Sequence, residues 1–434
     1  MKRKNKSILW CGFGIFIMAC IASLFYFSGL CKSFPNVFKS VQSVMSKDNA
    51  SGDEASVEES EEVKDESDEE MNEVKSKEEI IDEKAEEILK SMTLEEKAGQ
   101  LFIVELDSLN GGDTCTQFND IVSENLKKYH LGGIIYFSDN LVNRDQTIQL
   151  NEALQRNSKI PMFISVDEEG GSVARIADNG NMGTTKFSSM RQIGDSGNTD
   201  KAYEAGFTIG KEIHELGFNL DFAPDADVLT NPNNTEIGSR SFGTHADIVS
   251  EMVPQVVKGL HENNVCSTLK HFPGHGGSQA NSHNEFSYTP QNLEGLEKVE
   301  LLPFKAGIKE DTDFILVSHI AAPNITGDNT PSSLSYFIVT HILRNELGYD
   351  NIIITDALNM KAVSNYYTPQ QSSVEAFKAG EDMLLMPVRI DEAYNSIINA
   401  YNDGTISKER LNSSVKRILK IKIKRQIRYF LIYF

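Results

Sequence analysis

Short apolar runs alternate with amphipathic segments from about residue 100 to the end of the chain. The segments between the runs, such as residues 201–216 and 248–263, repeat apolar side chains at helical spacing. Eight alternations of strand and helix predict an α/β fold, the (β/α)8 TIM-type barrel. The eight predicted strands lie at Gln100–Leu106, Gly133–Phe137, Met162–Val166, Phe218–Ala223, Ser267–Leu269, Phe314–Val317, Ile352–Ile354 and Met383–Leu385.

An open, doubly wound sheet would show the same alternation. Such a sheet usually stops at about five or six strands and carries a Gly-rich phosphate-binding loop after the first. No such loop follows residues 100–106, so the barrel is favoured.

Ionisable side chains follow five of the predicted strands. Because parallel strands of a barrel end on one face, we expect these residues to converge on one mouth. A single strand-end Asp is usually a helix cap or turn former, and Asp227 is the member that turn capping explains most easily. Five strands ending in this way favour an active site over capping for the set as a whole. The set comprises Asp167, Asp225, Asp227, Lys270, His271, His319 and Asp356.

The segment Lys270–Gly276 reads Lys-His-Phe-Pro-Gly-His-Gly and is followed by His283. This mixture of turn-forming and ionisable residues is typical of a catalytic loop. His283 can transfer a proton, because imidazole titrates near neutrality. Asp356 follows a strongly apolar strand, where a carboxylate can act as a nucleophile or electrostatic stabiliser. One fixed carboxylate with one mobile acid/base is the arrangement of retaining glycoside hydrolysis.

The first 78 residues have a different composition. Four basic residues precede an uncharged run from Ser7 to Leu30, whose 24 residues exceed the roughly 20 that a membrane-spanning helix needs. We expect residues 1–31 to be a cytoplasmic basic end with a transmembrane signal anchor, and the rest of the chain to lie outside the cell membrane. A cleaved or lipidated signal is the alternative.

The composition of residues 32–78 predicts an acidic, disordered linker. Residues 79–434 are predicted to form the barrel domain. Between Gly52 and Glu87, 18 acidic residues and four lysines contribute −14 to the formal net charge of −21. The remainder shows no basic face, which argues against a nucleic-acid partner.

Within the domain, Thr93 followed by Glu96 predicts a capping box at a helix start. Cys266, at the head of a strand, predicts a buried, inert thiol.

Five motifs together resemble glycoside hydrolase family 3, in its single-barrel β-N-acetylglucosaminidase branch, from about Ser91 to Lys424. Their shared order and spacing make the match far more specific than any one motif. The motifs are Asp167–Gly171 with Arg175, Phe222–Pro224 with Asp227, Ile237–Gly243, Lys270–Gly276 with Ser282 and His283, and Thr355–Met360.

The resemblance implies roles for the matched positions. Asp356 matches the nucleophile that forms the covalent glycosyl-enzyme, and His283 matches the acid/base. The family needs no metal or other cofactor. We therefore expect an exo-acting, retaining, monomeric enzyme whose carbohydrate substrate carries terminal β-linked N-acetylglucosamine, as peptidoglycan fragments do. The residues that match those holding the sugar are Asp167, Arg175, Arg240, Lys270 and His271.

Asn281 departs from the family pattern, which usually has Asp two residues before the catalytic His. An Asp there accepts the imidazole N–H and stabilises the charged ring, whereas an Asn brings no negative charge. This departure predicts a slow enzyme or one whose acid function is supplied by another group, and it keeps open the alternative of a membrane-tethered amino-sugar-binding protein.

A metal-dependent barrel hydrolase is the second alternative. Histidine and carboxylate side chains are suitable zinc ligands. Lys270 argues against this alternative, because its ammonium group beside His271 would repel a cation. The candidate ligands are His271, His275, His319 and Asp356.

Overall fold

The computed structural model describes residues 75–281 and 286–427. The predicted anchor, nearly all of the predicted linker and His283 lie outside these ranges. Within them, no helix combines the length and the apolar character that crossing a bilayer requires.

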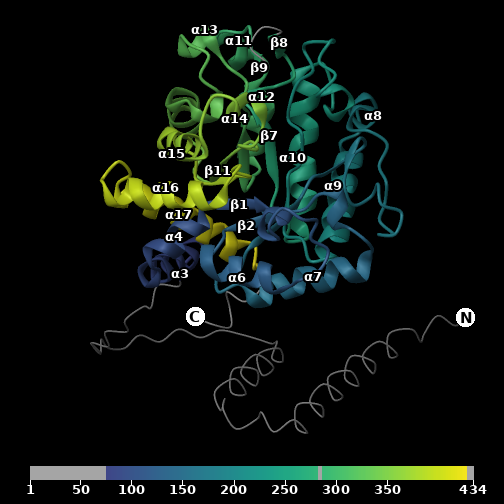
Figure 1. Ribbon diagram of the computed structural model, residues 1–434. Helices are drawn as coiled ribbons and strands as arrows, with labels where there is room; N and C mark the ends of the chain where they lie inside the picture. The colour runs from purple at the N-terminus through teal and green to yellow at the C-terminus, as the bar shows by residue number, and fades with distance from the viewer. Residues whose placement is uncertain (1–74, 282–285, 428–434) are drawn as a thin grey trace, which may run out of the picture. The chain divides into compact units, whose positions relative to one another are not determined.

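In the described residues, eight short parallel strands form a closed ring. Strands β1, β2, β7 and β11 are labelled near the centre of the domain in Figure 1. Two sets of paired strands, in the orders β12-β1-β2-β3-β6 and β11-β10-β7, make up the ring. Single parallel bridges between Leu220 and Cys266, and between Ile354 and Met383, join the two sets. All eight predicted strands are present, and the α/β architecture of a TIM-type barrel is confirmed. The strands are β1 (Phe102–Glu105), β2 (Gly133–Ile135), β3 (Phe163–Val166), β6 (Leu220–Asp221), β7 (Thr268–Phe272), β10 (Phe314–Val317), β11 (Ile352–Thr355) and β12 (Leu384–Leu385).

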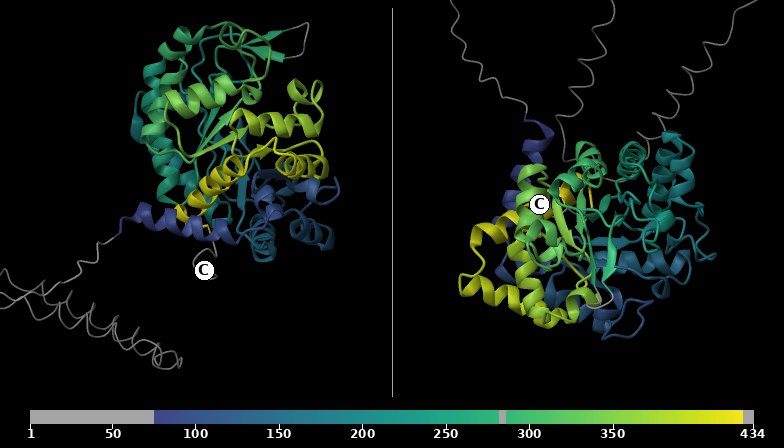
Figure 2. Two further views of the ribbon diagram at one scale, coloured as in Figure 1. Left: turned by 90° about the vertical axis from the view of Figure 1, so that its left-hand side faces the viewer. Right: turned by 90° about the horizontal axis from the view of Figure 1, so that it is seen from above.

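Helices between successive strands cover the outside of the ring. The neighbouring helices α9 and α10 pack closely (Figures 1 and 2), since a Cβ atom on Gly206 would lie only 2.5 Å from the Val256 carbonyl oxygen. The covering helices are α6 (Asp120–Tyr129), α7 (Arg144–Asn157), α9 (Thr199–Glu215), α10 (Ala246–Glu262), α12 (Leu301–Lys309), the π-helical η5 (Phe337–Glu346), α15 (Pro369–Ala379) and α16 (Ile390–Asn402).

Three further helices lie at the N-terminal end of the strands: α3 (Lys77–Ser91), α4 (Leu94–Gln100) and α17 (Lys408–Lys424). The predicted capping box opens α4, where the Thr93 N–H donates to the Glu96 carboxylate (3.0 Å) and the Glu96 N–H donates to Thr93 Oγ1 (3.2 Å). Helix α17 runs beside α3 (Figure 2), and Lys420 pairs with Glu78 at 3.0 Å. These contacts join the two ends of the described domain.

Cys266 is fully buried and forms no disulfide. Burial raises the pKa of its thiol well above the usual range, so it carries little of the reactive thiolate. The predicted buried, inert thiol is therefore confirmed.

Short elements fill the loops that follow the strands. Two of them are antiparallel hairpins, β4 (Glu168–Gly170) with β5 (Val173–Ala174) and β8 (Gln279–Asn281) with β9 (Phe286–Tyr288). The others are α5 (Leu106–Leu109), η2 (Ser138–Asn140), α8 (Met190–Asp195), η3 (Gly238–Arg240), α11 (Leu293–Lys298), α13 (Pro323–Thr326), η4 (Ser332–Leu334) and α14 (Lys361–Ser364).

Candidate active site

The C-terminal ends of the strands bring ionisable side chains together, as predicted. Strand β7 continues to Phe272 rather than ending at Leu269, so Lys270 and His271 belong to the strand itself. The Lys270 ammonium group lies 2.8 Å from the carboxylate of Asp167, which follows β3. Asp356, which follows β11, lies at the same end, because its N–H donates to the Val317 carbonyl of β10 at 2.8 Å and the Ser318 N–H donates to the Phe272 carbonyl of β7 at 2.9 Å. Residues from well-separated strands thus share one mouth of the barrel.

A buried carboxylate, Glu169, holds two of these cations in place. It lies 2.6 Å from Lys270 Nζ and accepts two hydrogen bonds from Arg240, at 2.9 and 2.8 Å. Burial raises the pKa of Glu169, but Lys270 and Arg240 outweigh that effect and lower it to about 2. Glu169 is therefore ionised at neutral pH, and it fixes the positions of both cations.

His271 is oriented by contacts on both ring nitrogens. Its Nδ1 lies 2.7 Å from the Asp227 carboxylate, and its Nε2 lies 3.2 Å from the Arg240 guanidinium. The His275 N–H also donates to Asp227. Asp227 is the strand-end residue that turn capping explained most easily, but its contacts are with His271 and His275. The local turn is capped by Asp225, whose carboxylate accepts the Asp227 N–H at 2.9 Å.

Asp356 is held by backbone and histidine contacts. Its carboxylate accepts the Ala357 N–H at 2.7 Å. The Ala357 carbonyl oxygen lies 3.0 Å from Nε2 of His319, and Nδ1 of that ring lies 2.7 Å from the Ser333 hydroxyl oxygen. Burial raises the pKa of Asp356, but His319, His271 and other neighbours outweigh burial and hold this pKa below its usual range. An ionised, fixed carboxylate of this kind is suited to nucleophilic attack.

Arg175 completes the side of the mouth next to Asp167. Its guanidinium lies 3.9 Å from the Asp167 carboxylate and 5.3 Å from the ring centroid of Phe137. The mouth thus contains Asp167, Arg175, Arg240, Lys270, His271 and Asp356. Asn281 is the last residue of β8, and His283 lies two residues further on, outside the described residues.

Two acidic residues beside Asp167 had no predicted role. Side chains alternate along an extended segment, so Glu169 points to the same side as Asp167 and meets Lys270, whereas Glu168 points away. Glu168 accepts the N–H groups of Ile176 (2.7 Å) and Ala177 (3.2 Å). Burial raises its pKa to about 7. The alternation in Asp167-Glu168-Glu169 was the available signal for both roles.

The residues of the mouth are poorly suited to a cation. Among the described residues, the donor atoms of Asp225, Asp227 and His271 lie within 4.8 Å of one another, as in a metal site. The Arg240 guanidinium already lies 3.7 Å from Asp225 and contacts His271 Nε2. A metal ion there would have to displace or tolerate a fixed positive charge.

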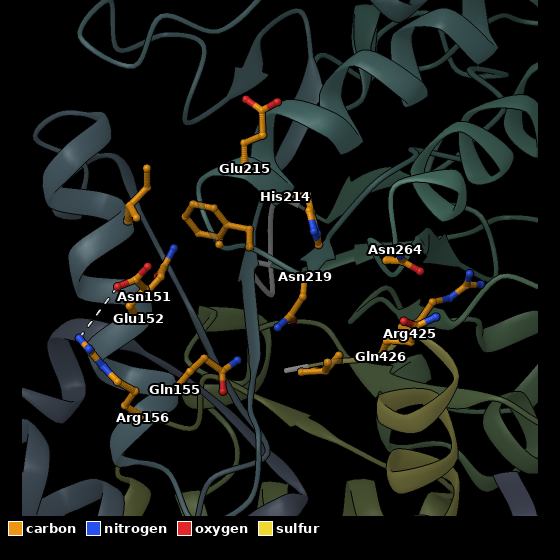
Figure 3. A pocket seen from close by; sticks show the side chains of 14 residues that line it. Asn151, Glu152, Gln155, Arg156, His214, Glu215, Asn219, Asn264, Arg425 and Gln426 are labelled. Atoms are coloured by element: carbon orange, nitrogen blue, oxygen red, sulfur yellow. Dashed lines mark ion pairs between the residues drawn. The ribbon is translucent and has the colours of Figure 1, made fainter. Parts of the chain in front are cut away.

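A separate cavity of about 240 Å³ lies at the opposite end of the strands (Figure 3). The polar side chains that line it make hydrogen bonds and an ion pair that stabilise the fold. Gln155 donates to the Met162 carbonyl at 2.7 Å, Asn219 accepts the Ile164 N–H at 2.9 Å, and Arg425 pairs with buried Asp313. These contacts assign the cavity to the structural base of the barrel rather than to the mouth.

Comparison with known proteins identifies the family. Residues 93–421 match the model of the glycosyl hydrolase family 3 N-terminal domain. The chain is 35% identical over 331 residues to β-hexosaminidase A of Pseudoalteromonas piscicida, covering 70% of this chain and 55% of that protein. It is 31% identical over 306 residues to β-hexosaminidase LpqI of Mycobacterium tuberculosis, covering 68% and 76%.

A solved structure shows the same relationship. The family 3 β-N-acetylglucosaminidase from Paenibacillus sp. matches with a TM-score of 0.72 and 34% identity, over 77% of this chain and 63% of that chain. The chain thus spans little more than half of the Pseudoalteromonas relative and under two thirds of the Paenibacillus one. These matches confirm the resemblance inferred from the five sequence motifs, and the chain belongs to glycosyl hydrolase family 3.

Proposed function

We propose that this protein is a retaining exo-β-N-acetylglucosaminidase. The observation that supports this most strongly is the Asp356 carboxylate at the mouth. Its pKa is held below the usual range by nearby groups that include His271 and Lys270, so it is ionised at neutral pH. The relatives named β-hexosaminidase and β-N-acetylglucosaminidase indicate the sugar.

The cluster around Lys270 is suited to a terminal sugar ring. The Asp167 carboxylate can accept hydrogen bonds from two hydroxyls, while Lys270 and Arg175 donate to ring or hydroxyl oxygens. Arg240 and His271 lie beside them. Because Glu169 and Asp227 already fix these groups, little ordering is needed when the sugar binds.

In the proposed reaction, Asp356 attacks the anomeric carbon while His283 donates a proton to the departing oxygen. The glycosidic bond breaks, and a glycosyl ester forms on Asp356. His283 then takes a proton from a water molecule, which attacks the same carbon and releases the carboxylate. Each of the two displacements inverts the anomeric carbon, so the product has the same anomeric configuration as the substrate.

The test is hydrolysis of a chromogenic N-acetylglucosaminide, with Asp356→Ala as the control. A slowly turned-over fluorinated substrate should label Asp356, as mapped by mass spectrometry of peptides, and NMR should show the β-anomer first. A label elsewhere or an inverted product would overturn the mechanism. Binding without turnover would favour the amino-sugar-binding alternative, and loss of activity with a strong chelator would favour the metal-dependent one.

We propose peptidoglycan fragments as the natural substrate and the outside of the cell membrane as the site of action. This rests on the basic residues and apolar run of residues 2–30, which predict an outward-facing anchor. Protease added to intact cells should release an active domain. Activity that stays protected until the cells are lysed would contradict this location.

A further inference from the structure

A buried carboxyl group that the proposed reaction does not use lies beside the end of β7. It belongs to Glu300, which is 1% exposed and directly precedes α12. Helix α12 packs on β7 (Figure 1), where the rings of Phe304 and Phe272 meet edge to face with their centroids 5.2 Å apart. The packing of α12 on the barrel therefore fixes the position of Glu300.

Residues 274–278, which follow β7, approach Glu300 so closely that two glycines have no room for a side chain. A Cβ atom on Gly274 would lie 2.5 Å from Cβ of Glu300, and one on Gly277 would lie 3.0 Å from its Oε1. The Thr230 hydroxyl donates to the same Oε1 at 3.3 Å, and a Cβ atom on Gly277 would lie 2.6 Å from that hydroxyl oxygen. Glu300 and Thr230 thus form one contact surface for this segment.

The same segment leads to the acid/base. It joins β7 to β8, whose last residue, Asn281, stands two positions before His283. The Asn234 side chain donates to the His275 carbonyl at 2.7 Å, so the loop after β6 also holds the segment. A displacement of residues 274–278 would move the strand that precedes His283, and misplacing a catalytic group by about 1 Å can cost about a hundredfold in rate.

The Glu300 carboxyl group forms no ion pair with a cation among the described residues. Its hydrogen-bond donor there is the Thr230 hydroxyl, the charge that acts on it is the anion of Asp227, and its Oε2 is buried without a partner. Burial and the charge of Asp227 raise the pKa of Glu300, which favours the neutral acid. The side chain is therefore suited to hold its neighbours by shape and hydrogen bonding rather than by charge.

We propose that Glu300 is a positioning residue for the acid/base, holding residues 274–278 through its shape and its hydrogen bond with Thr230. The inference rests on the proposed function and adds to it a residue that acts through His283. Its signature is a dependence on proton donation. A substrate whose departing oxygen needs a proton requires a well-placed acid, whereas an activated phenolate departs without one.

The test compares methyl β-N-acetylglucosaminide, whose departing oxygen must be protonated, with the 2,4-dinitrophenyl glycoside, whose phenolate leaves unprotonated. In the full-length protein, Glu300→Ala should lower kcat/KM for the methyl glycoside about tenfold or more, and change it less than about twofold for the dinitrophenyl glycoside. Glu300→Gln should restore the methyl glycoside rate to within about threefold of the original. His283→Ala is the reference for a missing acid/base, and Glu297→Ala, at an exposed position of α11, is the matched control.

Equal losses on both substrates in Glu300→Ala, or no loss on either, would overturn the inference. Failure of Glu300→Gln to restore the rate would also overturn it, because the charge rather than the shape would then be needed. Thr230→Val replaces an exposed residue and so keeps the inference testable if Glu300→Ala does not fold. Its expected loss is about threefold and confined to the methyl glycoside, and the absence of that loss would refute the inference.

Two outcomes concern the proposed function instead. If the unmutated protein hydrolyses neither substrate, the proposed function fails and the inference fails with it. If His283→Ala shows no loss confined to the methyl glycoside, His283 is not the acid/base, and both the mechanism and the inference fall. A selective loss in His283→Ala without one in Glu300→Ala refutes the inference alone.

Discussion

The ammonium group of Lys270 lies 2.6 Å from the carboxylate of Glu169, which is almost completely buried. Glu169 is also bound by Arg240, so one buried anion holds two cations that face the mouth. Burying an unpaired charge is very costly, and therefore each of these three residues depends on the others. The contact links the stability of the barrel to the geometry of its active site.

Glu169→Gln should damage both stability and activity. It leaves Lys270 and Arg240 without their buried counter-charge, and breaking such a pair costs about 3–5 kcal/mol. We expect a loss of about that size in urea unfolding and a fall in kcat/KM of about a hundredfold or more, because the cations lose their fixed positions. Asp178→Asn is the control, since its pair with Lys186 is exposed and should contribute less than about 1 kcal/mol. Similar effects from both variants would contradict this account.

Asp227→Asn should impair the site through His271. The carboxylate accepts three N–H groups, from the backbone and ring Nδ1 of His271 and the backbone of His275, and an amide has one oxygen for these three donors. An unsatisfied buried donor costs about 1–3 kcal/mol, so kcat/KM should fall about ten- to hundredfold. The ¹⁵N chemical shifts of His271 should show a changed tautomer, a readout that a purely structural role would leave unaltered.

Asp225→Asn serves as the comparison for that experiment. Burial and the charge of Asp227 raise the pKa of Asp225 well above its usual range, so its neutral form is favoured and an amide resembles it. We expect kcat/KM within about threefold of the original protein. If Asp225→Asn is the more damaging change, then Asp225 rather than Asp227 carries the charge that orients His271.

Glu168 should make stability depend on pH. Burial raises its pKa from 4.5 to about 7 on folding. A raised carboxyl pKa means that the folded state binds the proton more tightly. The contribution to stability is therefore fully present below pH 4.5 and is lost as the pH rises through 7, by about 3 kcal/mol in total.

Denaturant unfolding of the original protein and of Glu168→Gln at several pH values measures this effect. The difference between the two free energies of unfolding should shift by about 3 kcal/mol in favour of the Gln variant between pH 4.5 and pH 8. Glu124→Gln, at an exposed position of α6, should show no such shift. A constant difference for Glu168→Gln would mean that its hydrogen bonds to Ile176 and Ala177 keep the carboxylate ionised.

The sequence predicted the barrel well because burial on both faces produces continuous apolar runs in parallel strands. It predicted the mouth because Asp167 and Asp356 directly follow such strands. It did not reveal Glu169, because the alternation of side chains along residues 167–169 identifies its role only once Asp167 is known to meet Lys270. The pairing of Asp227 with His271 was also hidden, since it joins positions 44 residues apart. Contacts between loops depend on the closed ring, which local patterns do not encode.

Asn281→Asp should make the enzyme faster. Family 3 enzymes of this branch usually carry Asp two residues before the catalytic His, and Asn281 stands in that position relative to His283. A carboxylate there would stabilise the protonated imidazole and favour the tautomer that donates to the leaving group; the analogous Asp-to-Asn change in serine proteases costs about 10⁴ in rate. We expect kcat to rise at least several-fold, with a shift in the pH profile of kcat toward higher pH on its alkaline limb.

Asn157→Asp adds the same charge to an exposed position of α7, near the opposite end of the barrel, and is the matched control. It should leave both kcat and the pH profile unchanged. An unchanged rate for Asn281→Asp would show that proton donation by His283 does not limit turnover. A rise in rate without the alkaline shift would indicate that the new carboxylate contacts the substrate directly. The pH profile therefore distinguishes an effect on the acid/base His283 from an added contact with the sugar.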